Sequence, residues 1–384
     1  YIIDGFFDLG GKVFISSLKM LVVPLVFFSL VCGVSNLDNV KSIGSLGIKT
    51  FFLYLLTTGV AISLALFFAI LIQPGSGFNL PAAIDFQAQP ASSFKDVLLN
   101  IFPTNPIKSA AEGNMLQVIV FALLFGMGLA MGKKKTATLL KVCEQLNNVH
   151  MNIVTFLMQL APYGVFFLVA KVFADLGYQA ITPLLSYFFL VLFVLFFHLI
   201  MTYGLMLKYL SKINLHNFFT YFRSVMMFAF STASSSATLP ITMKTVMEKF
   251  KVRKSIAAFT LPLGATINMD GTAIMQGVAT VFIAQAYQID ISWLGYLTVV
   301  LTATLASIGA AGVPGVGLIT LAMVLRQVGL PVEGIGLIIG VDRLLDMVRS
   351  MVNVCGDATV SCIIENWEQK QEQHASPLQS PSME

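Results

Sequence analysis

Long runs of residues without a formal charge divide this chain. No Asp, Glu, Lys or Arg occurs in residues 20–37, 50–84, 115–132, 145–170, 176–207, 224–243, 255–269 and 291–325. A helix that crosses the hydrocarbon core of a bilayer needs about 20 predominantly apolar residues. The lengths of these stretches therefore predict membrane-spanning helices joined by polar connections.

The basic residues of these connections alternate between the two ends of the predicted helices. They occur at Lys41 and Lys49, at residues 133–135, and at Lys208, Lys212 and Arg223. The connections between these, residues 73–94 and 175–181, contain no Lys or Arg. Connections rich in Lys and Arg lie on the cytoplasmic side. This places residue 1 outside the cell. A cytoplasmic N-terminus would need one more helix before Tyr1, and we expect that first helix to be missing from this chain.

Two apolar segments are not expected to form single helices that cross the membrane. Segment 224–243 is interrupted by the serine-rich run 231–240, and basic residues flank it on both sides, at Arg223 and Lys244. A segment that enters and leaves on the same side is a re-entrant hairpin. Segment 291–325 is interrupted by the Gly- and Pro-rich run 307–317, and its length fits two half-helices with a tip between them. Each interruption alone could also be a flexible loop.

The two interruptions together predict an inverted repeat. Each is followed by a helical segment with polar groups, residues 268–272 after the first and residues 342–357 after the second. Non-helical backbone at membrane depth is tolerated where it is buried in protein or lines a cavity. In transporters, paired interruptions in two halves of the chain indicate the substrate site.

Asp270 stands alone between two charge-free stretches. A charged side chain at the bilayer centre costs at least about 2.5–3.5 kcal/mol, so Asp270 is either a packing carboxylate with a hydrogen-bonded neighbour or a ligand for a cation. Hard cations prefer oxygen ligands. Such oxygens are available from Asn268, Asp270, Thr272, Asn353 and Asp357.

Four polar residues of the last helix share one face. Asp342, Asp346, Arg349 and Asn353 are spaced by four, three and four positions. The stripe is either a self-contained ladder of ion pairs or a ligand site. As a ligand site it suits an acidic amino acid, because Asp346 can accept from an ammonium group and Arg349 can grip a carboxylate with two parallel hydrogen bonds. Small donors near Ser235 and after the Gly-Pro tip suit the α-carboxylate.

Composition supports a membrane protein. Of the 384 residues, 57% are hydrophobic and 11% are charged, whereas soluble domains carry about 25% charged residues. The net charge of +4 is too small to indicate nucleic acid as a partner. Cys32, Cys143, Cys355 and Cys362 have no metal-site spacing and read as free thiols.

The motifs above closely resemble those of the glutamate transporter family, the dicarboxylate/amino acid:cation symporters. The resemblance is carried by residues 234–240, 268–272, 309–315, 346–349 and 353–357, in that order, and extends over nearly the whole chain. It implies an all-α membrane protein with the inverted-repeat fold of that family and two re-entrant helical hairpins. It also implies a homotrimer in contact with membrane lipid, in which each subunit moves a transport core against a fixed scaffold.

The same resemblance divides the chain. It implies a scaffold helix at 1–46, a core helix with an extracellular loop at 47–97, scaffold helices at 98–180, a transport core at 181–366 and a disordered cytoplasmic tail at 367–384. Within the core it implies hairpin 1 at about 215–245, a helix at 250–287, hairpin 2 at about 291–328 and the last helix at 331–366.

Carried over position by position, the family's binding residues fall on matching positions of this chain. Substrate contacts are implied at Ser234, Ser235, Thr272, Val313, Gly317, Asp346, Arg349, Ser350 and Asn353. Three sodium sites are implied at Gly264, Asn268, Asn353 and Asp357; at Thr266, Ser307, Ile308 and Ala310; and at Tyr54, Thr57, Thr58, Asn268 and Asp270. Archaeal members carry an arginine at the first hairpin tip, where this chain has Ala233 and instead has Arg343 on the last helix.

Other functions compete with sodium-coupled symport of aspartate and glutamate. An intramembrane aspartyl protease needs Gly-x-Gly-Asp, and Val354 replaces the first glycine before Asp357. A passive channel fits the charged stripe less well than a ligand site does. Within the transporters, a carrier of neutral amino acids would lack Arg349 and a carrier of plain C4-dicarboxylates would lack Asp346. Proton coupling remains an alternative to sodium coupling, and the sequence predicts a transporter and not an enzyme.

Overall fold

The computed structural model of the protein describes residues 2–35, 45–76, 78, 102–176, 181–307 and 315–375. These residues form helices joined by short turns, with no strand among them. The first helices are α1 (Asp8–Ser35), α3 (Ser45–Ile72), α5 (Pro106–Glu112), α6 (Met115–Gly132), α7 (Ala137–Gln159) and α8 (Ala161–Leu176). The later helices are α9 (Ile181–Phe197), α10 (Gly204–Met206), α11 (Leu215–Thr232), α12 (Ser235–Lys249), α13 (Lys254–Ile267), α14 (Asp270–Ala286), α15 (Trp293–Ser307), α16 (Val316–Gln327) and α17 (Ile335–Ala375).

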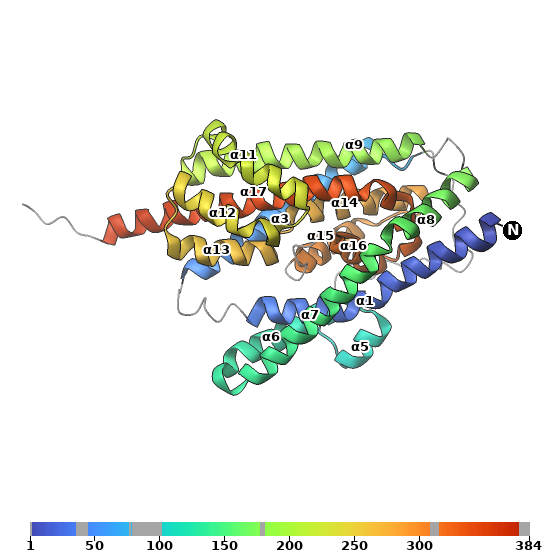
Figure 1. Ribbon diagram of the computed structural model, residues 1–384, viewed down its shortest axis with the longest axis horizontal. Helices are drawn as coiled ribbons and strands as arrows, with labels where there is room; N and C mark the ends of the chain where they lie inside the picture. Colours follow the sequence, from blue (N-terminus) through green and yellow to red (C-terminus); the bar gives the residue numbers. More distant parts are fainter. Residues whose placement is uncertain are drawn as a thin grey trace, which may run out of the picture.

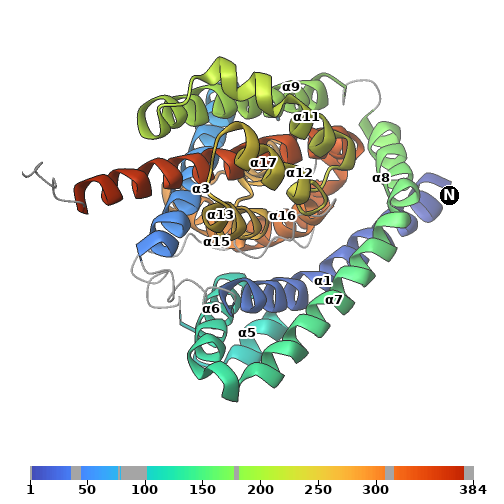
Figure 2. The same ribbon diagram turned by 60° about the vertical axis from the view of Figure 1, so that its left-hand side comes forward.

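The helices fall into two groups in space. Helices α1, α5, α6 and α7 lie together on one side of the molecule, and α8 runs from them along α1 to reach α17 (Figure 2). The other helices pack around α17, which runs lengthwise through their bundle (Figure 1). Helix α14 lies beside α17 and α3, and almost all of its side chains are buried.

The break between α13 and α14 brings backbone polar groups into this buried bundle. The sequence resemblance implied one continuous helix over 250–287, but the structure interrupts it at Asn268 and Met269, whose backbones are not helical. The first N–H groups of α14 lack helical partners for the same reason that every helix start does. One of them, from Gly271, donates to the side chain of Asn353 over 2.8 Å.

The first predicted hairpin is a pair of packed helices, α11 and α12. Its turn consists of Ala233, in the left-handed region at φ 49°, and Ser234, whose side chain caps α12 by accepting from the backbone N–H of Ala237. The interruption is shorter than the run 231–240 predicted from sequence, because a single left-handed residue and one capping serine suffice to reverse the chain.

The second predicted hairpin consists of α15 and α16, which also pack against each other. The residues between them, 308–314, lie outside the described part of the chain. The predicted site residues Ile308, Ala310 and Val313 therefore lie outside it too.

Helix α17 continues beyond the predicted end of the last helix at residue 366. Residues 367–375 are helical, so the expectation of a disordered tail is wrong for them, and residues 376–384 lie outside the described residues. Contacts with other elements hold this extension. Arg253 donates from Nη1 to Glu372 over 2.5 Å, and Lys49 Nζ lies 3.0 Å from Glu368.

Two helical stretches among the described residues have the length and apolar composition of membrane spans, Gly47–Ile72 and Ile181–Ser211. The pair Ala137–Leu157 and Pro162–Leu168, bent by 48°, would make a third if it forms one span. Other predicted segments are shorter or broken helices, such as α15 and α16, and α17 carries charged residues. Within the described residues, length and apolarity therefore identify fewer membrane spans than the charge-free stretches predicted.

Candidate functional site

The predicted cation ligands Asn268, Asn353 and Asp357 meet where the α13–α14 break faces the middle of α17. Asn268 donates from Nδ2 to Asp357 Oδ1 over 2.8 Å and to the backbone oxygen of Asn353 over 3.0 Å. All three side chains are buried. The other amide atom of Asn268, the acceptor Oδ1, is buried and receives no hydrogen bond from the described residues. An orphan buried acceptor beside a buried carboxylate is an arrangement that a cation completes.

Gly264 allows this cluster to pack. A Cβ built on residue 264 would overlap Asp357 Oδ1 and lie 2.6 Å from the hydroxyl of Tyr54. Gly264 therefore lies next to the cluster, and only a residue without a side chain fits between those two oxygens. The first predicted sodium set includes this glycine. Tyr54 donates from its hydroxyl to the backbone oxygen of Thr260 over 3.0 Å, so Tyr54 is oriented by α13.

Asp270, the other predicted cation ligand, is fully buried and faces α3. Its Oδ1 accepts from Thr58 over 2.6 Å. The single hydrogen of that hydroxyl could alternatively go to the backbone oxygen of Tyr54 at 2.9 Å, but the shorter contact to a carboxylate is the stronger one. Thr57 also donates to the backbone oxygen of Tyr54, over 3.1 Å. Of the third predicted sodium set, the structure brings Asp270 together with the turn 54–58 of α3, while Asn268 bonds Asn353 and Asp357.

Two further partners of Asp270, Tyr203 and His198, were not predicted from the sequence. Tyr203 donates to Asp270 Oδ2 over 2.6 Å, and His198 Nε2 lies 3.1 Å from the same oxygen. Both side chains are fully buried. His198 is the only histidine in the charge-free stretch 176–207, and that was the sequence signal that could have revealed it.

Arg349 lies at the centre of the polar stripe on α17 and is completely buried. Its Nη2 donates to Asp346 Oδ1 over 2.9 Å. Its Nη1 lies 3.0 Å from Asp342 Oδ1, which is an ion-pair distance, but the two atoms are not aligned as a hydrogen bond. Nε and Nη1 therefore have no acceptor among the described residues. Unpaired donors on a buried guanidinium fit an anionic ligand.

Two further predicted substrate contacts, Gly317 and Thr272, lie close to each other, and Gly317 lies close to this guanidinium. A methyl group on Gly317 would be 3.3 Å from Arg349 Nη1 and 3.4 Å from Thr272 Cγ2. The start of α16 and the start of α14 thus both approach α17 at Arg349. Asp346 is held from the other side, since its Oδ2 accepts from the backbone N–H of Gly315 over 3.3 Å and lies 3.8 Å from Nη1 of the exposed Arg343.

The remaining predicted residues are not linked to these clusters by the described contacts. Ser234 and Ser235 are buried at the α11–α12 turn, and Ser350 is buried on α17. Thr266 is exposed and donates within its own helix, to Leu263. Ser307 is buried and donates to Thr304 over 2.7 Å, so the second predicted sodium set, which also needs residues 308 and 310, is not assembled by the described residues.

The polar groups that the described residues bring to the clusters of predicted cation ligands are carboxylates, amides, hydroxyls and backbone carbonyls, together with His198. Among the described residues, no group of three His, Cys, Asp or Glu side chains could hold a metal ion. Oxygen-rich sets with one carboxylate each are suited to a hard monovalent cation more than to zinc or copper.

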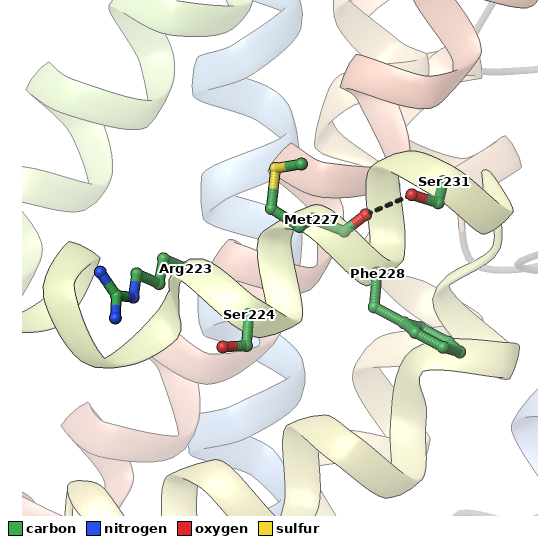
Figure 3. A pocket seen from close by; sticks show the side chains of 5 residues that line it. All are labelled: Arg223, Ser224, Met227, Phe228 and Ser231. Carbon is green, nitrogen blue, oxygen red and sulfur yellow. Dashed lines mark hydrogen bonds between the residues drawn. The ribbon is translucent and has the colours of Figure 1, made fainter.

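A surface pocket of about 520 Å³ lies away from these polar clusters (Figure 3). That pocket is against α11 and is lined by Arg223, Ser224, Met227, Phe228 and Ser231. None of these residues belongs to a predicted site, so the pocket does not identify the binding residues.

Comparisons with known proteins identify the relatives of this chain. A family model described as the sodium:dicarboxylate symporter family matches residues 4–367. The chain is 34% identical to the proton/sodium-glutamate symport protein of Bacillus subtilis (strain 168), over 93% of this chain and 85% of the relative. It is 35% identical to the proton/glutamate-aspartate symporter of Escherichia coli (strain K12), over 94% of this chain and 85% of the relative.

Relatives with another named substrate are equally similar. The chain is 34% identical to the neutral amino acid transporter B(0) of Oryctolagus cuniculus, over 96% of this chain and 75% of the relative. Overall identity therefore does not separate acidic from neutral substrates, and the residues of the site must do so.

Proposed function

The chain belongs to the sodium:dicarboxylate symporter family, and on that premise we propose that it carries the acidic amino acids L-aspartate and L-glutamate across a membrane together with sodium. Its function as a transporter and not an enzyme follows from the family and from the relatives described above. The substrate and the coupling ion are the steps that we add.

The buried Arg349 carries the proposal for an acidic substrate. Arg349 is buried and lies within ion-pair distance of Asp342 and Asp346, but its Nε and Nη1 have no hydrogen-bond acceptor among the described residues, which is costly unless a ligand supplies one. A side-chain carboxylate of the substrate would supply an acceptor to either of these donors. A neutral amino acid would leave the donors unpaired.

Asp346 supports an amino acid as the substrate. Its Oδ1 orients Arg349 and its Oδ2 accepts from the start of α16, so the carboxylate lies between the proposed carboxylate-binding group and the second hairpin. An ammonium group would be stabilised there by charge and by hydrogen bonds. A plain dicarboxylate would gain nothing from Asp346.

Asn268 and Asp357 support a cation as the cotransported ion. The unpaired Oδ1 of Asn268, the carboxylate of Asp357 and the nearby hydroxyl of Tyr54 offer three kinds of oxygen ligand within one buried cluster. Asp270 with Thr58 offers a second set. Asn353 contacts both Asn268 and Gly271, which links the cation cluster to the helix that carries Arg349.

The test is uptake into proteoliposomes that contain the purified protein. Labelled aspartate, glutamate, serine and succinate are compared while sodium, proton and potassium gradients are varied separately. We expect aspartate and glutamate uptake that needs an inward sodium gradient. Uptake of serine or succinate in preference to the acidic amino acids would refute the proposed substrate.

Proton coupling is the second candidate, because the Escherichia coli relative is named as a proton symporter. The same experiment separates the two. Uptake driven by a proton gradient with no dependence on sodium would replace sodium with the proton as the coupling ion.

We further propose that the protein works as a homotrimer within a cell membrane, surrounded by lipid, and that its core of α3 and α9–α17 moves against α1 and α5–α8. The separation of the helices into these two groups, joined by α8, is compatible with such movement (Figure 2). Crosslinking in liposomes tests the oligomeric state.

A further inference from the structure

Asp270 is bound on both carboxylate oxygens, but not equally. Oδ2 accepts from Tyr203 over 2.6 Å and faces His198 Nε2 at 3.1 Å, while Oδ1 accepts from Thr58 alone among the described residues. Each carboxylate oxygen offers about two acceptor positions. Oδ2 is therefore fully used, and Oδ1 keeps one position for a further partner.

A local change in helix type brings the two donors to Oδ2. Residues His198–Tyr203 form a π-helix within a continuous helical stretch. In an α-helix, residues five positions apart point in directions that differ by about 140°. The wider π turn places positions five apart on nearly the same face, and such segments are frequent at functional sites. The rings of His198 and Tyr203 accordingly lie 4.6 Å apart and share one carboxylate oxygen.

The contact with Asp270 assigns a hydrogen to Nε2 of His198, because a carboxylate oxygen only accepts. The other ring nitrogen, Nδ1, is buried and has no hydrogen-bond partner among the described residues.

We propose that His198 and Tyr203 are positioning residues of the cation site at Asp270, which hold Oδ2 and so direct Oδ1, with Thr58, towards the coupling cation. They have no contact with the cation in this arrangement and act through the carboxylate. The inference rests on the proposed sodium symport and adds to it the residues that set the affinity for the ion.

The chain offers a matched pair of tyrosines for the test. Tyr187 and Tyr203 lie in the same helical stretch and are both fully buried, but the Tyr187 hydroxyl has no hydrogen-bond partner among the described residues. Tyr203→Phe removes a donor to Asp270, whereas Tyr187→Phe removes a hydroxyl without one. For His198, His198→Leu removes the donor and His198→Gln retains an N–H at the end of the side chain.

The measurement is the sodium concentration that gives half-maximal aspartate uptake, together with the aspartate KM at saturating sodium. Tyr203→Phe and His198→Leu are expected to raise the half-saturating sodium concentration about three- to tenfold. The aspartate KM at saturating sodium should stay near that of the unmodified protein. His198→Gln should restore most of the sodium affinity, and Tyr187→Phe should match the unmodified protein.

Three results would overturn the inference. These are an unchanged sodium dependence in Tyr203→Phe and His198→Leu, equal effects of Tyr203→Phe and Tyr187→Phe, or no rescue by His198→Gln. The proposed function fails separately, when the unmodified protein shows no sodium-dependent uptake, and in that case the positioning role in a sodium site is overturned with it.

Discussion

Asn268 donates its side-chain N–H to Asp357 over 2.8 Å, while its side-chain oxygen Oδ1 is buried and has no donor among the described residues. The pair joins residues 89 positions apart and gives the α13–α14 break a fixed orientation on α17. It also separates the two functions of the amide, since the nitrogen holds the carboxylate and the oxygen is left for a ligand.

Asp357→Asn tests whether the charge at this pair couples sodium to substrate. The variant can still accept from Asn268, so it removes the charge and keeps the shape. Binding of the two ligands is reciprocal when they share structural elements, so we expect both the sodium dependence and the aspartate affinity to fall, although Asp357 is not proposed to touch aspartate. Calorimetric titration with aspartate at several sodium concentrations and constant ionic strength measures both.

Asp8→Asn is the control for that variant, because Asp8 forms a surface pair with Lys12 at 2.7 Å on α1. It should behave as the unmodified protein. An aspartate affinity that does not change with sodium in the unmodified protein would contradict sodium coupling altogether.

Gly264→Ala tests the packing beside Asp357. Its Cβ would overlap Asp357 Oδ1 and approach the Tyr54 hydroxyl, so the cation ligands must move apart and sodium affinity should fall at least about tenfold. Gly59→Ala on α3 is the matched control, since a Cβ there meets nothing within 4 Å. Sodium-dependent uptake distinguishes the two, and equal behaviour of both variants would show that Gly264 has no such role.

Arg349→Cys tests selectivity for acidic substrates. Removing a charge-assisted partner from a buried site costs about 2–5 kcal/mol, which corresponds to roughly 30-fold to several thousand-fold in affinity. Aspartate uptake should be lost and serine uptake should rise. Arg223→Cys, which changes an exposed arginine on α11 (Figure 3), should leave both unchanged. Retention of aspartate affinity in Arg349→Cys would exclude the proposed role.

Asp346→Asn tests recognition of the amino group. The amide oxygen can still accept from one of the two donors, Arg349 Nη2, while the amide nitrogen replaces the oxygen that accepts from Gly315 over 3.3 Å, so most of the site should survive. Aspartate binding should weaken strongly, while competition by succinate, which has no amine, should change little. Equal weakening of both ligands would mean that Asp346 supports the structure and does not read the substrate.

Glu365→Ala tests the contacts that hold the end of α17. Glu365 is buried and accepts from the backbone N–H and Nε of Arg253, so its removal leaves two donors without their partner and should cost about 1–3 kcal/mol of stability. Glu112→Ala removes one partner of an exposed pair with Lys108 and should cost under about 1 kcal/mol. Thermal unfolding in detergent compares them, and similar midpoints would contradict the stabilising role of Glu365.

The sequence by itself determined the features that depend on local pattern. Charge-free runs predicted apolar helices, the Ser-rich run predicted the reversal at Ala233, and the spacing of Asp346 and Arg349 placed them on one face of α17, where they pair at 2.9 Å. Motif order identified the family. These inferences hold because helix periodicity, turn chemistry and motif order are properties of neighbouring residues.

Only the tertiary structure decided which polar groups share a partner. His198 lies 72 positions before Asp270 and Tyr203 lies 67 before it, and nothing local to either residue specifies that contact. It depends on the packing of the α9 stretch against α14 and on a π-helical segment that the hydrophobic pattern does not encode. The helical extension to Ala375 is similar, because distant partners such as Arg253 and Lys49 order a polar segment whose composition alone indicated disorder.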